Sequence, residues 1–278
     1  MYSGFITRKR VIGKFGIHQR FDNLAYKLIL PMLKTQTFPT KKQILHFEGM
    51  NGPDGLKVKS PNYNEPSHLY NPKDNQGEVP THIKNHYALL TEALKQADLI
   101  RASFEAAWLA HFITDGLTPA HHAMGDEIVG LDQKSSKIIA VLLENPKKLE
   151  QNPRFKKLKK QWGMWGGKGV MTRHFYFELG AATAMMLARI KVKFDWDKYE
   201  LAQTKGPLAL FRREAKDIAK LNLYDRFQTE GWNNKIAKII KNQIAPQTIE
   251  TIAVIWLLAY VEAGLLKIVK PARTSKKD

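Results

Sequence analysis

Residues 111–122 hold the densest set of side chains in this chain that could bind a metal; they read His-Phe-Ile-Thr-Asp-Gly-Leu-Thr-Pro-Ala-His-His. His111 and Asp115 are four residues apart, so on a helix they project from one face, one turn apart. Pro119 cannot continue that helix without losing a backbone hydrogen bond, so His121 enters from a new direction. Imidazole and carboxylate groups suit zinc. The alternative interpretation is a buried helix whose His111 and Asp115 hydrogen-bond to each other.

A second pair with the same spacing, His174 and Glu178, opens an apolar stretch that we expect to be helical to about Val192. A helical His-x-x-x-Glu often arises by chance, so this pair gains weight from being the second of its kind in the chain. Two more candidates, Asp54 and His68, lie in a long polar segment rich in turn-forming residues. Loops of that length are usually functional or disordered.

The elements that must position these residues are all predicted to be helices. Apolar spacings of three and four residues predict a first helix from near His18 to Ile29, and another begins near Pro80. Residues 252–269 are nearly continuously apolar and approach the ~20 residues needed to span a bilayer. Because Glu262 and Lys267 interrupt them, we expect a buried core helix instead. The chain is predicted to be all-α, with residues 1–278 forming one domain.

The composition is strongly basic, with a formal net charge of +18, and it contains no cysteine. The charge favours anionic partners such as nucleic acid, anionic lipid surfaces or phosphorylated substrates, without choosing among them. The absence of cysteine excludes disulfides and thiolate metal ligands. We expect residues 126–168 to be a basic insertion and residues 271–278 a short basic tail. The basic residues of the insertion include Lys134, Lys137, Lys147, Lys148, Arg154, Lys156, Lys157, Lys159 and Lys160.

The order and spacing of the candidate residues resemble the zinc-dependent phospholipase C family, which is related in fold to the single-strand-specific zinc nucleases. The resemblance implies an all-α, multi-helix bundle with a phosphodiesterase site of up to three metals. The segments that carry it are His18, Pro53-Asp54, Ser67-His68-Leu-Tyr-Asn-Pro, His111-x3-Asp115-x3-Pro119-x-His121 and His174-x3-Glu178.

The resemblance also implies how the ligands divide among two or three zinc ions. His68, His111 and Asp115, with Asp54 nearby, would hold the first ion, and Asp54 is also the candidate general base. The second ion would be held by His121, His174 and Glu178. A third would use His18 and a bridging Asp115, completed in the family by the N-terminal amine and carbonyl. Here residues 1–17 precede His18, which leaves two or three ions open.

The expected activity is hydrolysis of phosphodiesters by a metal-activated water, with a phospholipid as the favoured substrate. Glutamate at position 178 is typical of the phospholipase branch, whereas the nucleases usually carry aspartate there. A zinc nuclease on the same fold is the alternative, which the +18 charge favours. A third hypothesis is a protein that binds membranes or nucleic acid and keeps only a structural metal site.

Histidines outside the ligand pattern are expected to be structural or exposed; they are His46, His82, His86 and His122. Because His122 follows His121 directly, a shift of one residue would exchange their roles. The N-terminal residues contain no apolar stretch typical of a signal peptide, although the resembled family is usually secreted. The site of action is left open.

Overall fold

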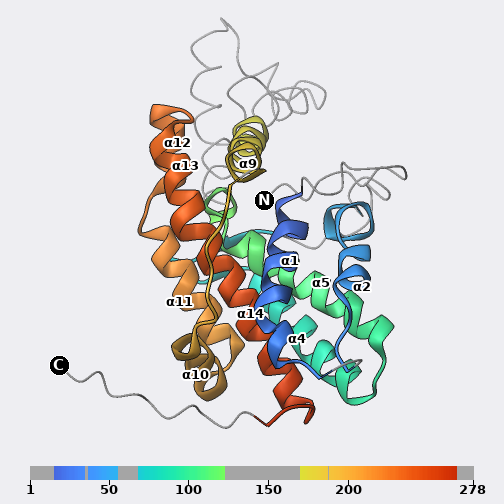
Figure 1. The fold of residues 1–278 in the computed structure, drawn as a ribbon. Coiled ribbons are helices and arrows are strands. Elements are labelled where there is room, and N and C mark those ends of the chain that lie inside the picture. The colour runs from blue at the N-terminus through green and yellow to red at the C-terminus, as the bar shows by residue number, and fades with distance from the viewer. Residues whose placement is uncertain (1–15, 35–36, 56–67, 123–169, 187, 268–278) are drawn as a thin grey trace, which may run out of the picture.

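The structure is a computed structural model that describes residues 16–34, 37–55, 68–122, 170–186 and 188–267 (Figure 1). In this part of the chain the fold is predominantly helical, as predicted. The α-helices are α1 (Ile17–Ile29), α2 (Lys41–His46), α4 (Val79–Lys95), α5 (Leu99–Gly116), α9 (Val170–Met186), α10 (Trp196–Lys205), α11 (Pro207–Ala219), α12 (Leu223–Glu230), α13 (Asn234–Ile239) and α14 (Ala245–Glu262).

Short elements complete the described chain. Two 3₁₀ turns, η2 (Leu30–Met32) and η3 (Gly49–Asn51), follow α1 and α2, and a π-helical turn, η4 (Ile240–Ile244), joins α13 to α14. Two-residue strands β1 (Tyr70–Asn71) and β2 (Gln76–Gly77) pair in antiparallel register. This hairpin is the whole sheet content of the described residues and does not alter the all-α class.

Helix α14 lies at the centre of the fold and packs against α1, α4, α5, α10 and α11 (Figure 1). Nearly all its residues from Thr248 to Tyr260 are buried. The Trp256 indole nitrogen donates a hydrogen bond to the Ala106 carbonyl, 3.1 Å away, which ties α14 to α5. Residues 234–262 are long and apolar enough to cross a membrane, but 78% of the most apolar window is buried inside the structure. The prediction of a core helix is therefore confirmed here.

The helix boundaries follow local chemistry at most ends. Asp98 accepts a hydrogen bond from the Arg101 amide at the start of α5, and Asp195 does the same for α10. Proline occupies the first turn of α4, α11 and α14, where its missing N–H has no intrahelical partner to lose. The Asp98 cap fixes the start of α5, whose last two turns carry His111 and Asp115.

Two expected boundaries are wrong by several residues. Helix α9 ends at Met186 instead of about Val192, because the chain continues from Ala188 in non-helical form toward α10. Helix α14 ends at Glu262, so the apolar run beyond it is not one continuous helix. The expected basic insertion and basic tail lie outside the described residues.

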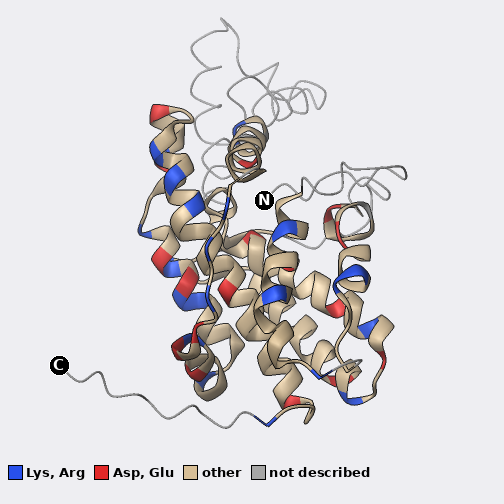
Figure 2. Cartoon of the chain, in the orientation of Figure 1, with Lys and Arg blue, Asp and Glu red and all other residues tan. Residues whose placement is uncertain are grey.

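Lys and Arg of the described helices are interspersed with Asp and Glu and do not gather over one element (Figure 2). One buried charge, Lys198, contacts Glu214 at 3.1 Å and Glu250 at 2.8 Å and so joins α10, α11 and α14. The positions of the basic residues in this view therefore do not single out one helix as a surface for anions.

Candidate metal centre

All eight candidate residues converge at one end of α5 and form three groups that could hold metal ions. Within each group one ligand atom per residue lies within 4.8 Å of the others. The first group and the second share His111. The groups are His18, His111 and Asp115; Asp54, His68 and His111; and His121, His174 and Glu178.

Asp115 lies between these groups, and its carboxylate contacts four imidazole rings. Oδ1 is 3.3 Å from His18 Nε2 and 3.5 Å from His121 Nε2. Oδ2 is 2.5 Å from His68 Nδ1 and 3.1 Å from His111 Nε2. A carboxylate whose two oxygens face different sets of histidines has the arrangement of a ligand that bridges two ions.

The spacing of the donor atoms fits metal coordination. Two atoms each about 2.1 Å from a tetrahedral zinc ion lie about 3.4 Å apart. The nitrogen–oxygen distances measured within the groups run from 3.0 Å, between His174 and Glu178, to 3.7 Å, between His111 and Asp54. His111 Nε2 is buried, 3.1 Å from Asp115 Oδ2 and 3.7 Å from Asp54 Oδ1, so a metal ion bound there would take the place of a direct His111–Asp115 hydrogen bond.

The end of α5 sets the direction of its two ligands and of the next one. The helix stops at Gly116, where an added Cβ would lie 2.5 Å from the Phe211 ring, so α11 approaches closely there. The chain turns at residues 117–118, and a new helical turn begins at Pro119. His121 therefore enters from a second direction, as the proline predicted.

Backbone groups orient His121 and its neighbour His122. The Nδ1–H of His121 donates to the His68 carbonyl, 2.9 Å away, so Nε2 faces Asp115 and Glu178. His122 turns away and donates from Nε2 to the Gly116 carbonyl at 2.7 Å. Of these two histidines, His121 lies in a group that could hold a metal ion and His122 does not.

Helix α9 supplies the remaining two ligands from the edge of the fold. Glu178 Oε1 lies 3.0 Å from His174 Nε2 and 3.1 Å from His121 Nε2. On the same side of α9, Phe177 is buried and its ring packs against three aromatic rings; these belong to Tyr224, Phe227 and Trp232. These contacts fix the face that α9 turns toward His121.

Arg20 joins the far end of α9 to α1. Its guanidinium donates hydrogen bonds to the carbonyls of Met185, Met186 and Ala188. The last carbonyls of a helix lack intrahelical donors, and a positive charge there is favourable. The helix that carries His174 is thus attached to the helix that carries His18.

The electrostatics of the centre favour ionised carboxylates. Burial alone would raise the pKa of Asp115, but surrounding positive charge, including the imidazoles of His121, His111 and His18, holds it well below its usual value. The pKa of Glu178 is likewise lowered against the effect of burial, with His174 contributing. Burial lowers the pKa of His121 to about 4, so its ring is neutral near pH 7. Neutral imidazole and ionised carboxylate are the forms that bind metals.

Asp54 differs from the other carboxylates of the centre in its exposure. Its side chain is 33% exposed, against 2% for Asp115 and 14% for Glu178. Burial and the nearby Asp115 would raise its pKa, but the charges of His111, His68 and His18 together outweigh them and lower the pKa to about 2. Asp54 is therefore an ionised carboxylate that solvent can reach beside the buried groups.

Two buried carboxylates beside the centre were not predicted. Glu48 is fully buried, with Oε2 3.4 Å from His111 Nδ1. Asp22 is also buried, and burial followed by the charge of Glu48 raises its pKa well above the usual value. Asp22 follows His18 by four residues, which is the spacing of the other two pairs. That repeated spacing is a signal that could have found Asp22, whereas Glu48 has no such signal.

The other histidines outside the groups are exposed or structural, as expected. His46 is exposed at the end of α2. The His86 ring stacks on Phe112 at a centroid distance of 5.5 Å, and its Nδ1 lies 2.5 Å from Glu105. His82 stacks on the same phenylalanine ring at 4.3 Å. None of the three belongs to a metal group among the described residues.

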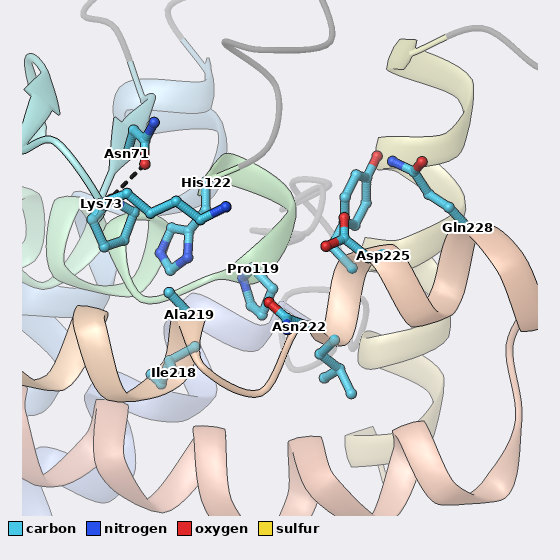
Figure 3. Close-up of a pocket in the computed structure, with 12 residues that line it drawn as sticks. Asn71, Lys73, Pro119, His122, Ile218, Ala219, Asn222, Asp225 and Gln228 are labelled. Atoms are coloured by element: carbon cyan, nitrogen blue, oxygen red, sulfur yellow. Dashed lines mark hydrogen bonds between the residues drawn. The ribbon is translucent and has the colours of Figure 1, made fainter.

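A pocket of about 190 Å³ lies next to the centre (Figure 3). It is lined by the β1–β2 turn, by Pro119 and His122, and by the turn from α11 to α12. The Asn222 backbone in that turn is left-handed, with φ +47°. Since His122 points into this pocket and His121 into the metal group, the two sites lie on opposite sides of one short helical turn.

No protein-family model matches the chain, and no curated protein is similar enough to it to count as a relative. A function must therefore be argued from the geometry and chemistry of the metal centre.

Proposed function

We propose that this protein is a zinc-dependent phosphodiester hydrolase of the phospholipase C type. The observation that carries the proposal is the Asp115 carboxylate, whose oxygens lie 2.5–3.5 Å from nitrogens of four histidines. Adjacent metal ions that share a carboxylate are typical of enzymes that hydrolyse phosphate esters. The donor set contains only imidazole and carboxylate, which suits zinc.

Zinc, when bound, supplies positive charge that offsets the charge developing on a phosphodiester and makes water more acidic. The chain's own residues then have separate tasks. The buried histidines and Asp115 hold the positive charge in one place. Asp54, ionised and partly exposed, accepts the proton of the attacking water if that water lies within hydrogen-bond reach. The new P–O bond forms as the bond to the alcohol breaks, and the departing alkoxide takes up a proton from bulk water, which in turn receives the proton that Asp54 accepted.

The phospholipid substrate is favoured by Glu178, because the resembled phospholipases carry glutamate and the resembled nucleases usually carry aspartate at this ligand. Glu178 contacts both other ligands of its group, so its identity affects the size of that group directly. The +18 charge fits an anionic membrane as the surface on which such an enzyme acts, and peripheral contact with it is part of the proposal.

A zinc nuclease is the second candidate, and the same net charge favours it. The two candidates share a reaction at phosphorus and differ in the alcohol that leaves. Assays with different substrates can therefore distinguish the two candidates, whereas zinc content cannot.

The test uses purified full-length protein loaded with zinc. Vesicles of phosphatidylcholine and phosphatidylglycerol are assayed for release of phosphorylated headgroup, and a single-stranded DNA oligonucleotide is assayed in parallel. We expect headgroup release that stops when zinc is chelated. Asp54→Asn should lower kcat by about 10²- to 10⁴-fold, the usual contribution of a general base. His46→Ala, which changes an exposed histidine outside the groups, should leave the rate unchanged.

Two results would overturn the phospholipase proposal. Zinc-dependent cleavage of DNA without any headgroup release would assign the nuclease activity instead. Tight binding of vesicles by the zinc-loaded protein with hydrolysis of neither substrate would mean that the centre is structural.

A further inference from the structure

We propose that Glu48 is a positioning residue that orients His111 for metal binding. Only the metal-binding part of the proposed function underlies this proposal; it does not depend on which phosphodiester is hydrolysed. Glu48 follows α2 and lies next to the centre, although it belongs to none of the three metal groups. The proposed role follows from the directions in which the two ring nitrogens of His111 point.

The His111 ring faces carboxylates on both sides. Its Nε2 points to the metal groups, 3.1 Å from Asp115 and 3.7 Å from Asp54. Its Nδ1 points the other way, to Glu48 Oε2 at 3.4 Å. A proton on Nδ1 donated to Glu48 leaves the lone pair of Nε2 for a metal ion. Carboxylates that accept from the outer nitrogen of a ligating histidine fix its tautomer and ring orientation.

His111 is the ligand for which such control matters most, because it belongs to two of the three groups. Its ring also stacks on the His18 ring at a centroid distance of 4.2 Å, so a rotation of His111 would displace a further ligand. The two groups that contain His111 are called the core groups below. A residue that holds the His111 ring at Nδ1 therefore affects both core groups at once.

The backbone holds Glu48 in place for this contact. Its Oε2 accepts a hydrogen bond from the Gly49 amide at 3.2 Å as it caps the 3₁₀ turn η3. Gly49 has φ +62°, in the left-handed region that glycine adopts without strain. The carboxylate is thereby directed from a short turn toward His111.

The ring of His121 is oriented in the same way, but the acceptor for its Nδ1–H is a backbone carbonyl instead of a carboxylate. Its Nδ1 donates to the His68 carbonyl at 2.9 Å, and its Nε2 faces the metal group. A backbone carbonyl cannot be altered by substitution, whereas Glu48 can. His111 therefore offers the experiment that His121 does not.

The burial of the Glu48 carboxylate is unfavourable for folding, and packing alone gives no reason for a carboxylate at this position. It is fully buried, and Oε1 makes no hydrogen bond to any described residue. The nearby Asp22 is buried too, and both of its oxygens lack hydrogen bonds to described residues. Burying carboxylates without such partners is unfavourable for folding. A role in holding a metal ligand accounts for keeping Glu48 in this position.

The experiment compares zinc affinity, measured by competition with a chromophoric chelator, among full-length variants. Glu48→Ala should weaken zinc binding by about 10- to 100-fold, the usual effect of removing an outer partner of a ligating histidine. Glu48→Gln, which still offers an acceptor oxygen, should restore part of the affinity. The visible absorption of the cobalt-loaded protein should shift in Glu48→Ala, because His111 is a ligand of both core groups.

Glu105→Gln is the matched control. Glu105 is equally buried and contacts a histidine, His86, that belongs to no metal group. Its substitution should lower the melting temperature and leave zinc affinity and the cobalt spectrum unchanged. Melting curves of the metal-free variants confirm that each is folded at the assay temperature.

Two outcomes would overturn the proposal. A folded Glu48→Ala with the zinc affinity and cobalt spectrum of the unsubstituted chain would show that Glu48 does not position His111, while leaving the hydrolase proposal intact. An unsubstituted chain that binds no zinc would remove both proposals together. Absence of hydrolysis alone has no bearing on Glu48.

Discussion

The half of the metal centre on α1 and α5 lies inside the helical core, whereas the half on α9 lies at its edge. His18 and His111 are fully buried, and α5 packs against α1, α2, α4 and α14. Phe175 and Tyr176 on α9, beside its ligands, are about half exposed. Ligands in a packed core are held by many neighbours at once, but a helix at the edge depends on a few contacts. The core half should therefore be preformed, and the α9 half should follow the attachment of α9.

The largest expected effect comes from Asp115→Asn, which should remove the ions of both core groups and end hydrolysis. Asparagine has nearly the same shape but no charge to balance the four imidazoles and bound metal. Zinc at 1,000 times its dissociation constant stabilises a protein by about 4 kcal/mol per site, so the melting temperature should also fall. Elemental analysis of the folded variant measures the loss.

Glu178→Gln is the companion variant in the α9 half. It should release the ion of its own group and leave the core ions in place, because Glu178 belongs only to the group that it forms with His121 and His174. Equal loss of zinc in both variants would show that the two halves do not differ.

A smaller effect is expected when the packing of α9 is removed. Phe177→Ala takes away the ring that contacts Tyr224, Phe227 and Trp232, at a cost of about 3–5 kcal/mol. The loss should fall mainly on α9, where hydrogen exchange should speed up while α5 stays protected. The control Phe21→Ala lies in the core on α1 and should lower protection throughout. If Phe177→Ala speeds up hydrogen exchange more in α5 than in α9, the proposed difference between the core half and the α9 half of the centre is wrong.

The smallest effect is expected from the far end of α9. Arg20→Met removes the donors to the carbonyls of Met185, Met186 and Ala188. Hydrogen bonds to a charged group contribute about 1.5–3 kcal/mol, and partial exposure of Arg20 places this loss near the lower value. Faster hydrogen exchange is expected in the last turn of α9, with zinc retained. Arg20→Lys should recover part of the protection, and no change in exchange would rule out this attachment.

Local patterns sufficed for most of the helices and for five of the ligands, which are His111, Asp115, His121, His174 and Glu178. His18 was expected as a ligand only from the family resemblance. The spacing of apolar residues placed α1, and Pro119 placed the turn that redirects His121. The pairs on α5 and α9 were visible because residues four apart share a helix face. Asp54 and His68 lie in a segment without periodicity, so their membership was expected from the family resemblance and their convergence with His111 came from the fold.

Three residues show what local patterns miss. Asp22 repeats the four-residue spacing after His18 but was not recognised as part of the centre. Glu48 follows no period, because its position depends on a turn between helices. Arg20 looks like an ordinary polar residue of an amphipathic helix, and only packing brings it to the end of a helix about 165 residues away.

The sequence alone determined the helical class, the ligand types and the absence of thiolate ligands, because each depends on residue identity or on spacing within one helix. The tertiary structure decided that Asp115 lies among four imidazoles, that Asp54 remains open to solvent, and that Glu48 lies behind His111. Those relations join segments far apart in the chain. Their distances depend on how α1, α5 and α9 pack, and a pattern within one segment carries no information about that packing.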